Sequence, residues 1–162
     1  MAITTPLGAT AMLAVRGPGD AFGELALVSR DEPVRSATVS ALEAGETRSV
    51  LREEFARLRR EHPSVDSVLA AILAERVRRL SEQLTEAYYL SAEARVLRRL
   101  VELSELYGGV VPLPQEALAE LAGTSRATVN RVLRDQEERG IVQLGRAKIA
   151  VVARDRLRAA RY

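Results

Sequence analysis

The sequence contains no cysteine, and this absence removes several classes of protein at once. Without a thiol there is no disulfide framework, no thiolate zinc or iron–sulfur site and no cysteine nucleophile. Histidine is nearly absent as well: the only one is His62, and its place beside Pro63 is typical of a solvent-facing residue at a helix end. Because no clustered acidic motif replaces these groups, the sequence predicts neither an enzyme nor a metal site.

Long apolar runs are also lacking. No run reaches the roughly 18 residues that a bilayer-spanning helix requires. The first residues, "MAITTPLGATAMLAV", have no basic start of the kind found in a signal peptide. We therefore expect a cytoplasmic chain with no membrane contact. Hydrophobic residues make up 47% of the sequence, which is enough for a buried core in one large domain or two small ones.

The net charge is small, +2, but it is unevenly distributed. Residues 112–162 carry ten Arg or Lys against six acids, whereas residues 1–111 carry fourteen against sixteen. The basic part is therefore the C-terminal third, as expected of a segment that approaches a polyanion.

The first third of the chain has the patterning of strands. Residues 11–28, "AMLAVRGPGDAFGELALV", place a turn at Gly17–Asp20 between two apolar runs. Residues 34–43, "VRSATVSALE", alternate in polarity and predict a further strand. The next twenty residues predict a turn, a short strand and a short helix that ends near Pro63. We therefore expect residues 1–64 to be mostly β.

Residues 65–90 predict one long helix. Its apolar positions are separated by alternating steps of three and four residues, the spacing of a coiled-coil seam, whose natural partner is a second copy of the chain. The alternative is that this face packs against the β part of the same chain, but flanking arginines and glutamates leave only a narrow apolar stripe, which favours the dimer. The predicted seam consists of Ala70, Leu73, Val77, Leu80, Leu84 and Ala87.

Residue 91 begins a second helical domain, which opens on a helix that ends at Gly108–Gly109. Two short helices follow, Gln115–Ala122 and about Ser125–Arg139. Gly123 can adopt the left-handed conformation that ends the first of them, and Ser125 can cap the second, so the chain turns sharply. This is the pattern of a helix-turn-helix, with apolar contacts between the two helices from Leu118, Leu121, Val129, Val132 and Leu133.

The second of these helices turns basic residues outward, which predicts contact with DNA. Residues at its start would reach base edges in the major groove, where an arginine can donate twice to guanine. Hydroxyl residues and the positive end of the helix suit phosphates. After it, residues 140–157 predict a β-hairpin around Gly145–Arg146, which completes a winged helix. The predicted DNA contacts are Thr124, Ser125, Arg126, Thr128, Asn130, Arg131, Arg134, Arg146 and Lys148.

From about Gly17 to Leu157, the chain resembles the bacterial transcription factors of the cyclic-AMP receptor protein and fumarate–nitrate regulator (Crp/Fnr) family. "GTSRATVNRVL" is similar to the recognition-helix motif of the family, and "GDAFGELALV…VRSATV" is similar to its phosphate-binding cassette. The resemblance implies that Arg126 and Arg131 read guanines and that Ser125 and Thr128 hold phosphates. Ala127 stands where well-known members have a base-reading glutamate, so we expect an operator that differs from the common half-site.

Two further positions depart from the family pattern. Pro114 replaces the hydroxyl residue that usually caps the first helix of the motif, which removes one expected phosphate contact. Leu80 stands where cyclic-AMP binders have one of two hydroxyls directed at adenine, so base recognition is predicted to be weakened or changed.

The resemblance also implies a pocket for cyclic AMP or another cyclic nucleotide. Glu24 would accept a hydrogen bond from the ribose 2′-hydroxyl, and Arg35 would pair with the phosphate. The alternative is a ligand-free roll in which Glu24 and Arg35 only pair with each other. The implied pocket residues are Gly23, Glu24, Leu25, Ala26, Arg35, Ser36, Ala37 and Ser81.

The β-roll of this family begins well before the cassette, whereas only "MAITTPLGATAMLAVR" precedes it here. We therefore expect an α+β chain with three parts: a partial, truncated cyclic-nucleotide-binding β-roll at residues 1–64, a long dimerisation helix at 65–90 and a winged helix-turn-helix domain at 91–162. A fragment, a late start codon and a natural truncation with exposed sheet edges would each give this pattern.

Two functions are consistent with these features. The first is a homodimeric, sequence-specific transcription regulator that binds an inverted repeat in double-stranded DNA. A cyclic nucleotide or another small effector would control it, and the resemblance implies that it contacts RNA polymerase. The second is a truncated sensor or interaction module that pairs with a full-length relative through the long helix without itself binding DNA.

Overall fold

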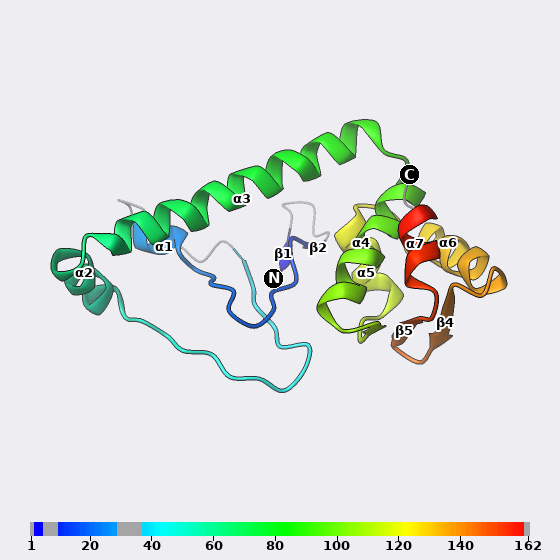
Figure 1. Cartoon of the computed structure of the whole chain (residues 1–162), viewed down its shortest axis with the longest axis horizontal. Coiled ribbons are helices and arrows are strands. Elements are labelled where there is room, and N and C mark those ends of the chain that lie inside the picture. The colour runs from blue at the N-terminus through cyan, green and yellow to red at the C-terminus, as the bar shows by residue number, and fades with distance from the viewer. Residues whose placement is uncertain (1, 5–9, 29–36, 161–162) are drawn as a thin grey trace.

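The computed structural model describes residues 2–4, 10–28 and 37–160 (Figure 1). Helix α3 (Ser64–Tyr89) runs along the molecule from α2 (Arg52–Glu61) at one end to a compact helical domain at the other. None of the described helices is both long and apolar enough to cross a membrane.

The N-terminal part contains less β-structure than the sequence predicts. Strands β1 (Ala2–Thr4) and β2 (Thr10–Met12) form an antiparallel pair, and Thr38 adds one isolated bridge to Ala2. The second apolar run forms a short helix, α1 (Leu25–Val28), and no strand forms within residues 39–51. The prediction of a mostly β first third is therefore wrong for the described residues. Strands are stable only when paired, and residues 39–51 find no partner strand there.

Helix α2 confirms the predicted short helix, and the exposed His62 lies at its C-cap, as expected. Helix α3 confirms the long helix almost to the residue. Leu90 and Ser91 form the elbow between α3 and the next helix, α4 (Ala92–Leu106). The Ser91 side chain accepts a hydrogen bond from the Ala94 N–H at 3.1 Å and caps α4. Helix α4 stops before Gly108 and Gly109, which both have positive φ, as predicted.

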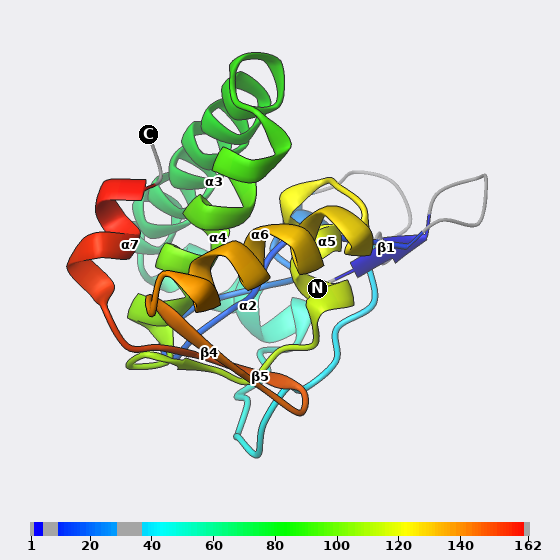
Figure 2. The ribbon, with the colours of Figure 1, turned by 90° about the vertical axis from the view of Figure 1, so that its right-hand side faces the viewer.

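The rest of the chain forms the winged domain (Figure 2). Helices α5 (Gln115–Ala122) and α6 (Arg126–Glu138) pack on α4, and a three-stranded sheet of order β3-β5-β4 closes one side. The strands are β3 (Val110–Val111), β4 (Val142–Gly145) and β5 (Lys148–Val151). The core lies within this domain; its largest fully buried side chains include Leu100, Leu113, Leu118, Leu133, Ile149 and Leu157.

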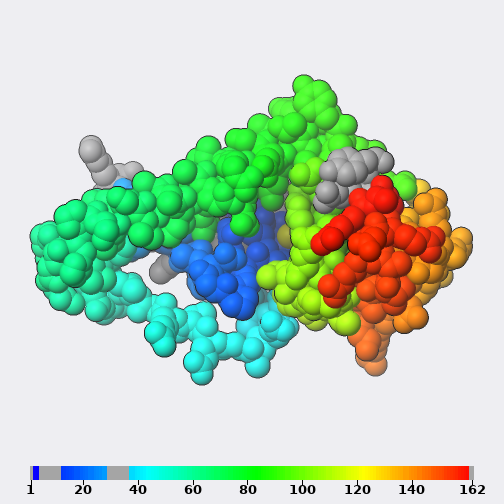
Figure 3. All heavy atoms as spheres, viewed as in Figure 1, coloured from blue at the N-terminus to red at the C-terminus, as the bar shows by residue number. Residues whose placement is uncertain are grey.

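Helix α7 (Arg154–Ala160) was not predicted, and it covers α4 (Figure 3). Leu157 is fully buried against the core, Arg158 pairs with Glu105 at 2.8 Å, and Arg154 donates to the Gly108 carbonyl. Because α4 leads directly from the long helix, α7 stiffens the part of the domain that carries the helix-turn-helix.

The wing turn consists of Arg146 and Ala147, one residue later than the predicted centre at Gly145–Arg146, because Gly145 pairs with Lys148 in the ladder. Ala147 has φ +54, a left-handed conformation that costs a residue with a Cβ about 1–2 kcal/mol. We expect Ala147→Gly to raise the free energy of unfolding by about 0.5–1 kcal/mol, because glycine adopts this conformation without the steric penalty.

Urea unfolding followed by circular dichroism would measure this difference. A matched control is Ala150→Gly in strand β5, where we expect a loss of about 0.5–1 kcal/mol because glycine weakens a regular strand. A loss of stability in both variants would contradict the strain assigned to Ala147.

Candidate nucleic-acid interface

The turn between α5 and α6 has the predicted geometry. Gly123 has φ +60, and the Thr124 N–H donates to the Ala119 carbonyl at 3.0 Å, which closes the end of α5. The Ser125 hydroxyl accepts from the Thr128 N–H at 3.1 Å and lies 3.0 Å from the Thr128 hydroxyl, so it caps α6. Pro114 supplies no side-chain cap to α5. The chain thus turns sharply within the three residues Gly123, Thr124 and Ser125.

Helix α6 is divided into two faces. Val129 and Leu133 are fully buried, Val132 is nearly so, and together with Leu118 they fix α6 against α5 as the sequence predicts. Leu121 packs at the edge of the same core. The opposite face of α6 stays in solvent, and this face carries the arginines.

The three arginines of the exposed face have different surroundings. Arg126, in the first turn, forms no ion pair or hydrogen bond with any described residue. Arg131 lies 3.6 Å from a Glu93 carboxylate oxygen, with 68% of the Arg131 side chain exposed. Arg134 donates from Nε to the side-chain oxygen Oδ1 of Asn130 at 3.1 Å. A surface pair such as Arg131–Glu93 stabilises little and exchanges easily, so both Arg126 and Arg131 are available to a ligand.

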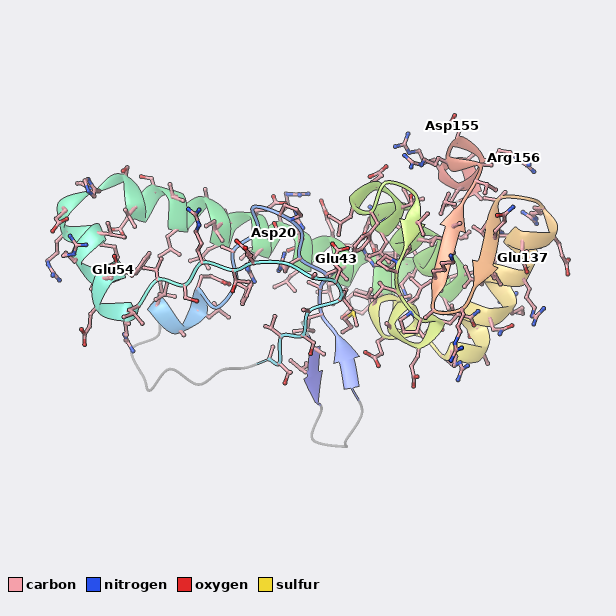
Figure 4. The ribbon with its side chains drawn as sticks, turned by 90° about the horizontal axis from the view of Figure 1, so that it is seen from below. Asp20, Glu43, Glu54, Glu137, Asp155 and Arg156 are labelled. Atoms are coloured by element: carbon pink, nitrogen blue, oxygen red, sulfur yellow. The ribbon has the colours of Figure 1, made fainter. Side chains whose placement is uncertain are left out.

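The wing, which consists of β4, β5 and the turn between them, lies on the same side of the domain as the start of α6. Arg146 and Lys148 are exposed, and Lys148 lines a hollow of about 280 Å³ together with Arg126 and Gln115. At the other end of α6, the Glu137 carboxylate accepts from the Leu144 N–H at 2.9 Å and fastens the helix to the wing (Figure 4). The structure therefore gathers the start of α6, the start of α5 and the wing around one hollow, where Arg126 and Lys148 outnumber the single acid Glu116 and suit a phosphate backbone.

The predicted nucleotide pocket is described only in part, because Arg35 and Ser36 lie outside the described residues. Gly23 has φ +86 and precedes α1, which contains Leu25 and Ala26. Glu24 is 5% exposed. Its partner in the described structure is Arg76 of α3, whose Nε lies 3.0 Å from the Glu24 carboxylate. The pairing is ionic rather than directional, since neither Glu24 oxygen accepts a hydrogen bond from a described residue.

Arg16 is a pocket residue that sequence reasoning missed. Its buried Nε donates to no described residue. Burial, and then the like charge of Arg76, lowers the pKa of Arg16, and the Glu24 charge acts on it in the opposite direction. Arg76 also donates to the Ala21 carbonyl at 2.6 Å, which ties this loop to α3. Asp20 and Arg79 also act on Arg16, so three guanidinium groups and two carboxylates influence one another here, an excess of positive charge that favours an anion.

Ser81 and Ala37 form no hydrogen bond with Glu24, Arg16 or Arg76 in the described part of the chain. The Ser81 hydroxyl donates to the Val77 carbonyl at 2.9 Å on α3. Ser81 lies five positions after Arg76 on the helix, which turns its side chain about 140° around the helix axis relative to Arg76. Ser81 lines a second hollow of about 460 Å³, between α3 and α4, together with Thr85, Glu86 and Arg98. Ala37 lies half-buried beside the Ala2–Thr38 bridge.

The predicted seam on α3 is uncovered in the single chain. Val77, Leu80 and Leu84 are 64%, 62% and 56% exposed, Ala70 and Ala87 are also exposed, and Leu73 is half-buried. The face therefore does not pack on the β part of the same chain. Tyr88 and Tyr89 extend the exposed surface to the end of the helix.

Two groups of polar contacts at the elbow between α3 and α4 had no signal in the sequence. Arg95 donates to the Leu90 carbonyl and to the carbonyls of Ala122 and Gly123, at 2.9, 2.9 and 3.0 Å, so it joins the elbow to the turn before α6. Glu86, 6% exposed, pairs with Arg98 and with Arg99 of α4. These contacts connect the end of the long helix α3 to α4 and to the turn before α6.

Comparison with known proteins agrees with this arrangement. Residues 1–62 match the family model for the cyclic nucleotide-binding domain, and residues 94–160 match that for the Crp-like helix-turn-helix domain. The chain is 42% identical over 142 residues to the cyclic AMP receptor protein of Thermus thermophilus, covering 86% of this chain and 64% of that protein.

A second relative is the CRP-like cAMP-activated global transcriptional regulator of Mycobacterium tuberculosis, 30% identical over 160 residues, with 94% of this chain and 70% of that protein covered. The chain thus spans about two thirds of the length of these relatives. In fold it is similar to a transcriptional regulator of the CRP/FNR family from Thermus thermophilus, with a TM-score of 0.70, 20% identity and coverage of 98% and 80% of the two chains.

These matches define the class as proteins that join a cyclic nucleotide-binding domain to a helix-turn-helix domain. Within that class, the chain belongs to the Crp/Fnr family of bacterial regulators.

Proposed function

We propose that this chain is a homodimeric, sequence-specific DNA-binding transcription regulator that places α6 in the major groove. The observation that carries the proposal is the division of α6: its apolar face is buried, its start is capped by Ser125, and Arg126 projects from the exposed face with no described partner. An exposed guanidinium with no partner among the described residues is free to donate to a base edge without breaking a contact within the protein.

In this proposal the side chains of α6 divide the recognition between them. Arg126 and Arg131 donate to guanine edges, and Arg131 leaves Glu93 when it does so. Thr124, Ser125 and Thr128 contact phosphates at the positive end of the helix. Arg146 and Lys148 of the wing contact the phosphates alongside.

The exposed seam of α3 supplies the dimer. An apolar stripe of this length on one helix is stabilised when a second copy covers it. Two copies related by a two-fold axis present two α6 helices, so the operator is an inverted repeat with half-sites about one helical turn apart. Because the chain matches the Crp-like helix-turn-helix model and a relative named as a transcriptional regulator, the alternative of an interaction module that does not itself bind DNA is not favoured. In this proposal the chain acts in the cytoplasm, where it binds chromosomal DNA and contacts RNA polymerase.

The experiment that tests the proposal is a selection of operators from random duplexes, followed by anisotropy titrations. We expect an enriched inverted repeat whose affinity falls as salt rises, because phosphate contacts release counterions. Equal affinity for the enriched and a scrambled duplex would contradict sequence-specific binding.

We further propose that the N-terminal part binds a cyclic nucleotide. Glu24 supports this, because a carboxylate that is 5% exposed and accepts no hydrogen bond from a described residue is ready to accept one from a ribose hydroxyl. Arg16 and Arg76 add positive charge for the phosphate, and the matching family model and the names of the relatives point to the same ligand class. The effector would act by favouring one arrangement of the α3 pair and thus one spacing of the two α6 helices.

We expect cyclic AMP or cyclic GMP to bind in calorimetric titration, and Glu24→Gln to weaken binding by about 10-fold or more. The amide loses the charged acceptor, whose hydrogen bond contributes about 1.5–3 kcal/mol. Glu54→Gln is the control, because Glu54 lies on α2 in an exposed pair with Arg57 (Figure 4). A silent titration of the unaltered protein would contradict the ligand assignment without affecting the DNA-binding proposal.

A further inference from the structure

Asn130 lies at the centre of a chain of side-chain hydrogen bonds between α5 and the third turn of α6. The side-chain nitrogen Nδ2 of Asn130 donates to the side-chain oxygen Oε1 of Gln115 at 3.2 Å, and Asn130 Oδ1 accepts from Arg134 Nε at 3.1 Å. Gln115 is the first residue of α5. Both ends of the Asn130 amide are therefore engaged within the protein.

These hydrogen bonds form the Gln115–Asn130–Arg134 relay. The donors and acceptors of the three side chains fix which way each amide is turned in it. A guanidinium group has only donors, so Asn130 must turn its oxygen toward Arg134. Its NH₂ group then faces Gln115, which must present its own oxygen in return. Only this arrangement of the two amides satisfies both hydrogen bonds. Gln115 and Asn130 are half-buried, whereas Arg134 is exposed and keeps both Nη groups free of the described residues.

We propose that Asn130 is a positioning residue: it does not read bases, and it holds Arg134 ready for a backbone phosphate of DNA. The inference rests on the proposed function and replaces the sequence prediction that Asn130 itself contacts DNA. Arg134 lies eight residues after Arg126, about 12 Å further along the helix, so it meets the wall of the groove when Arg126 meets the bases.

Two physical effects support this role. An asparagine that reads adenine turns both ends of its amide to the base, whereas here one N–H and one oxygen lone pair of Asn130 are engaged by Gln115 and Arg134, which hold the amide in an orientation set within the protein. An arginine that is already ordered loses less conformational freedom when it binds, and the ordering of one such side chain changes affinity by roughly 2- to 10-fold. The relay therefore affects affinity through Arg134 and leaves base preference unchanged.

The test is a set of anisotropy titrations at several salt concentrations on the selected operator, with the single variants Asn130→Ala and Arg134→Ala and their double variant. We expect Arg134→Ala to reduce the slope of log affinity against log salt by about 0.9 per subunit. Asn130→Ala should weaken binding roughly 2- to 10-fold per subunit. In the double variant it should add nothing to the loss caused by Arg134→Ala.

Two further variants serve as controls. Gln115→Met removes the acceptor at similar size and should reproduce part of the Asn130→Ala loss, so it tests the relay even where Asn130→Ala disturbs folding. Arg139→Ala, at the end of α6 in an exposed pair with Asp135, should leave the slope unchanged. Additive losses in the double variant, or a changed base preference at one operator position in Asn130→Ala, would overturn the inference and make Asn130 a base reader.

A measurement without DNA separates the relay from the proposed function. The Arg134 Nε–H resonance should exchange slowly with water in the unaltered protein and rapidly in Asn130→Ala. Equal rates in the two proteins would show that the relay does not form. If the unaltered protein binds no duplex while the rates differ, the proposed function fails and the relay stands only as a structural link between α5 and α6.

Discussion

Replacing Leu80 and Leu84 with glutamate should convert the protein from a dimer to a monomer and reduce its affinity for the inverted repeat by a factor of about 100 or more. Both leucines are more than half exposed in the single chain. Covering a leucine completely stabilises an interface by about 1.5–3 kcal/mol, and the two copies contribute four of them. Glutamates at these positions would also bring like charges together across the seam.

The loss of DNA affinity follows from the loss of linkage. When the two α6 helices are joined, the second half-site is bound intramolecularly, which raises overall affinity by about 10²- to 10⁴-fold. Sedimentation equilibrium gives the mass, and titration of a full operator against a single half-site gives the linkage. Val68→Glu is the control, because Val68 is 59% exposed on α3 but lies outside the predicted seam. A double glutamate variant that stays dimeric would place the dimer contact elsewhere.

The second large effect is expected for Arg126 and Arg131, the two arginines that we propose to read bases. Each Arg126→Ala or Arg131→Ala substitution removes two contacts from a dimer, and one good arginine–guanine contact contributes about 1–3 kcal/mol of discrimination. We therefore expect each variant to lose affinity for the operator by about 30-fold or more, while affinity for scrambled DNA changes little.

The measurement is the ratio of specific to non-specific affinity at one fixed salt concentration. Arg156→Ala is the matched control, because Arg156 is an exposed arginine that belongs to α7 rather than to α6 (Figure 4). An unchanged ratio in both Arg126→Ala and Arg131→Ala would contradict the base-reading role. Equal losses on operator and scrambled DNA would make these side chains phosphate contacts instead.

Much of the C-terminal domain could be predicted from the sequence because its signals are local. Gly123 permits a left-handed turn, Ser125 caps the helix three residues before the N–H it accepts from, and valines three residues apart fix the buried face of α6. Each signal requires only a few neighbouring residues, and all of them indicate the same element. The turn and the positions of α5 and α6 agree with the prediction for this reason.

The N-terminal part was poorly predicted because a strand depends on partners far away in the chain. Alternation within residues 37–43 shows only that the segment could pair, and the structure provides one bridge, from Thr38 to Ala2. The apolar run at Leu25–Val28 is equally compatible with a short helix. The spacing of apolar residues alone does not distinguish a strand from a short helix in segments of this length.

The polar contacts that organise the site were missed for a related reason. Arg95 reaches carbonyls 27 and 28 residues away, Arg76 reaches a carbonyl 55 residues away, and Gln115 meets Asn130 across 15 residues. No spacing rule of a helix or strand connects such pairs. The charge pattern indicated that α6 was basic, but only the packing of α4, α5 and α6 shows which groups hold its side chains in place.

The most direct test of the central claim, that α6 reads guanines in the major groove, is methylation interference on the selected operator. Methylation at guanine N7 blocks the major-groove edge to which an arginine would donate. We predict that methylation at symmetric guanines about one helical turn apart abolishes binding by the unaltered protein, and that Arg126→Ala becomes insensitive at one of these positions in each half-site. Binding that tolerates methylation at every guanine would contradict the account.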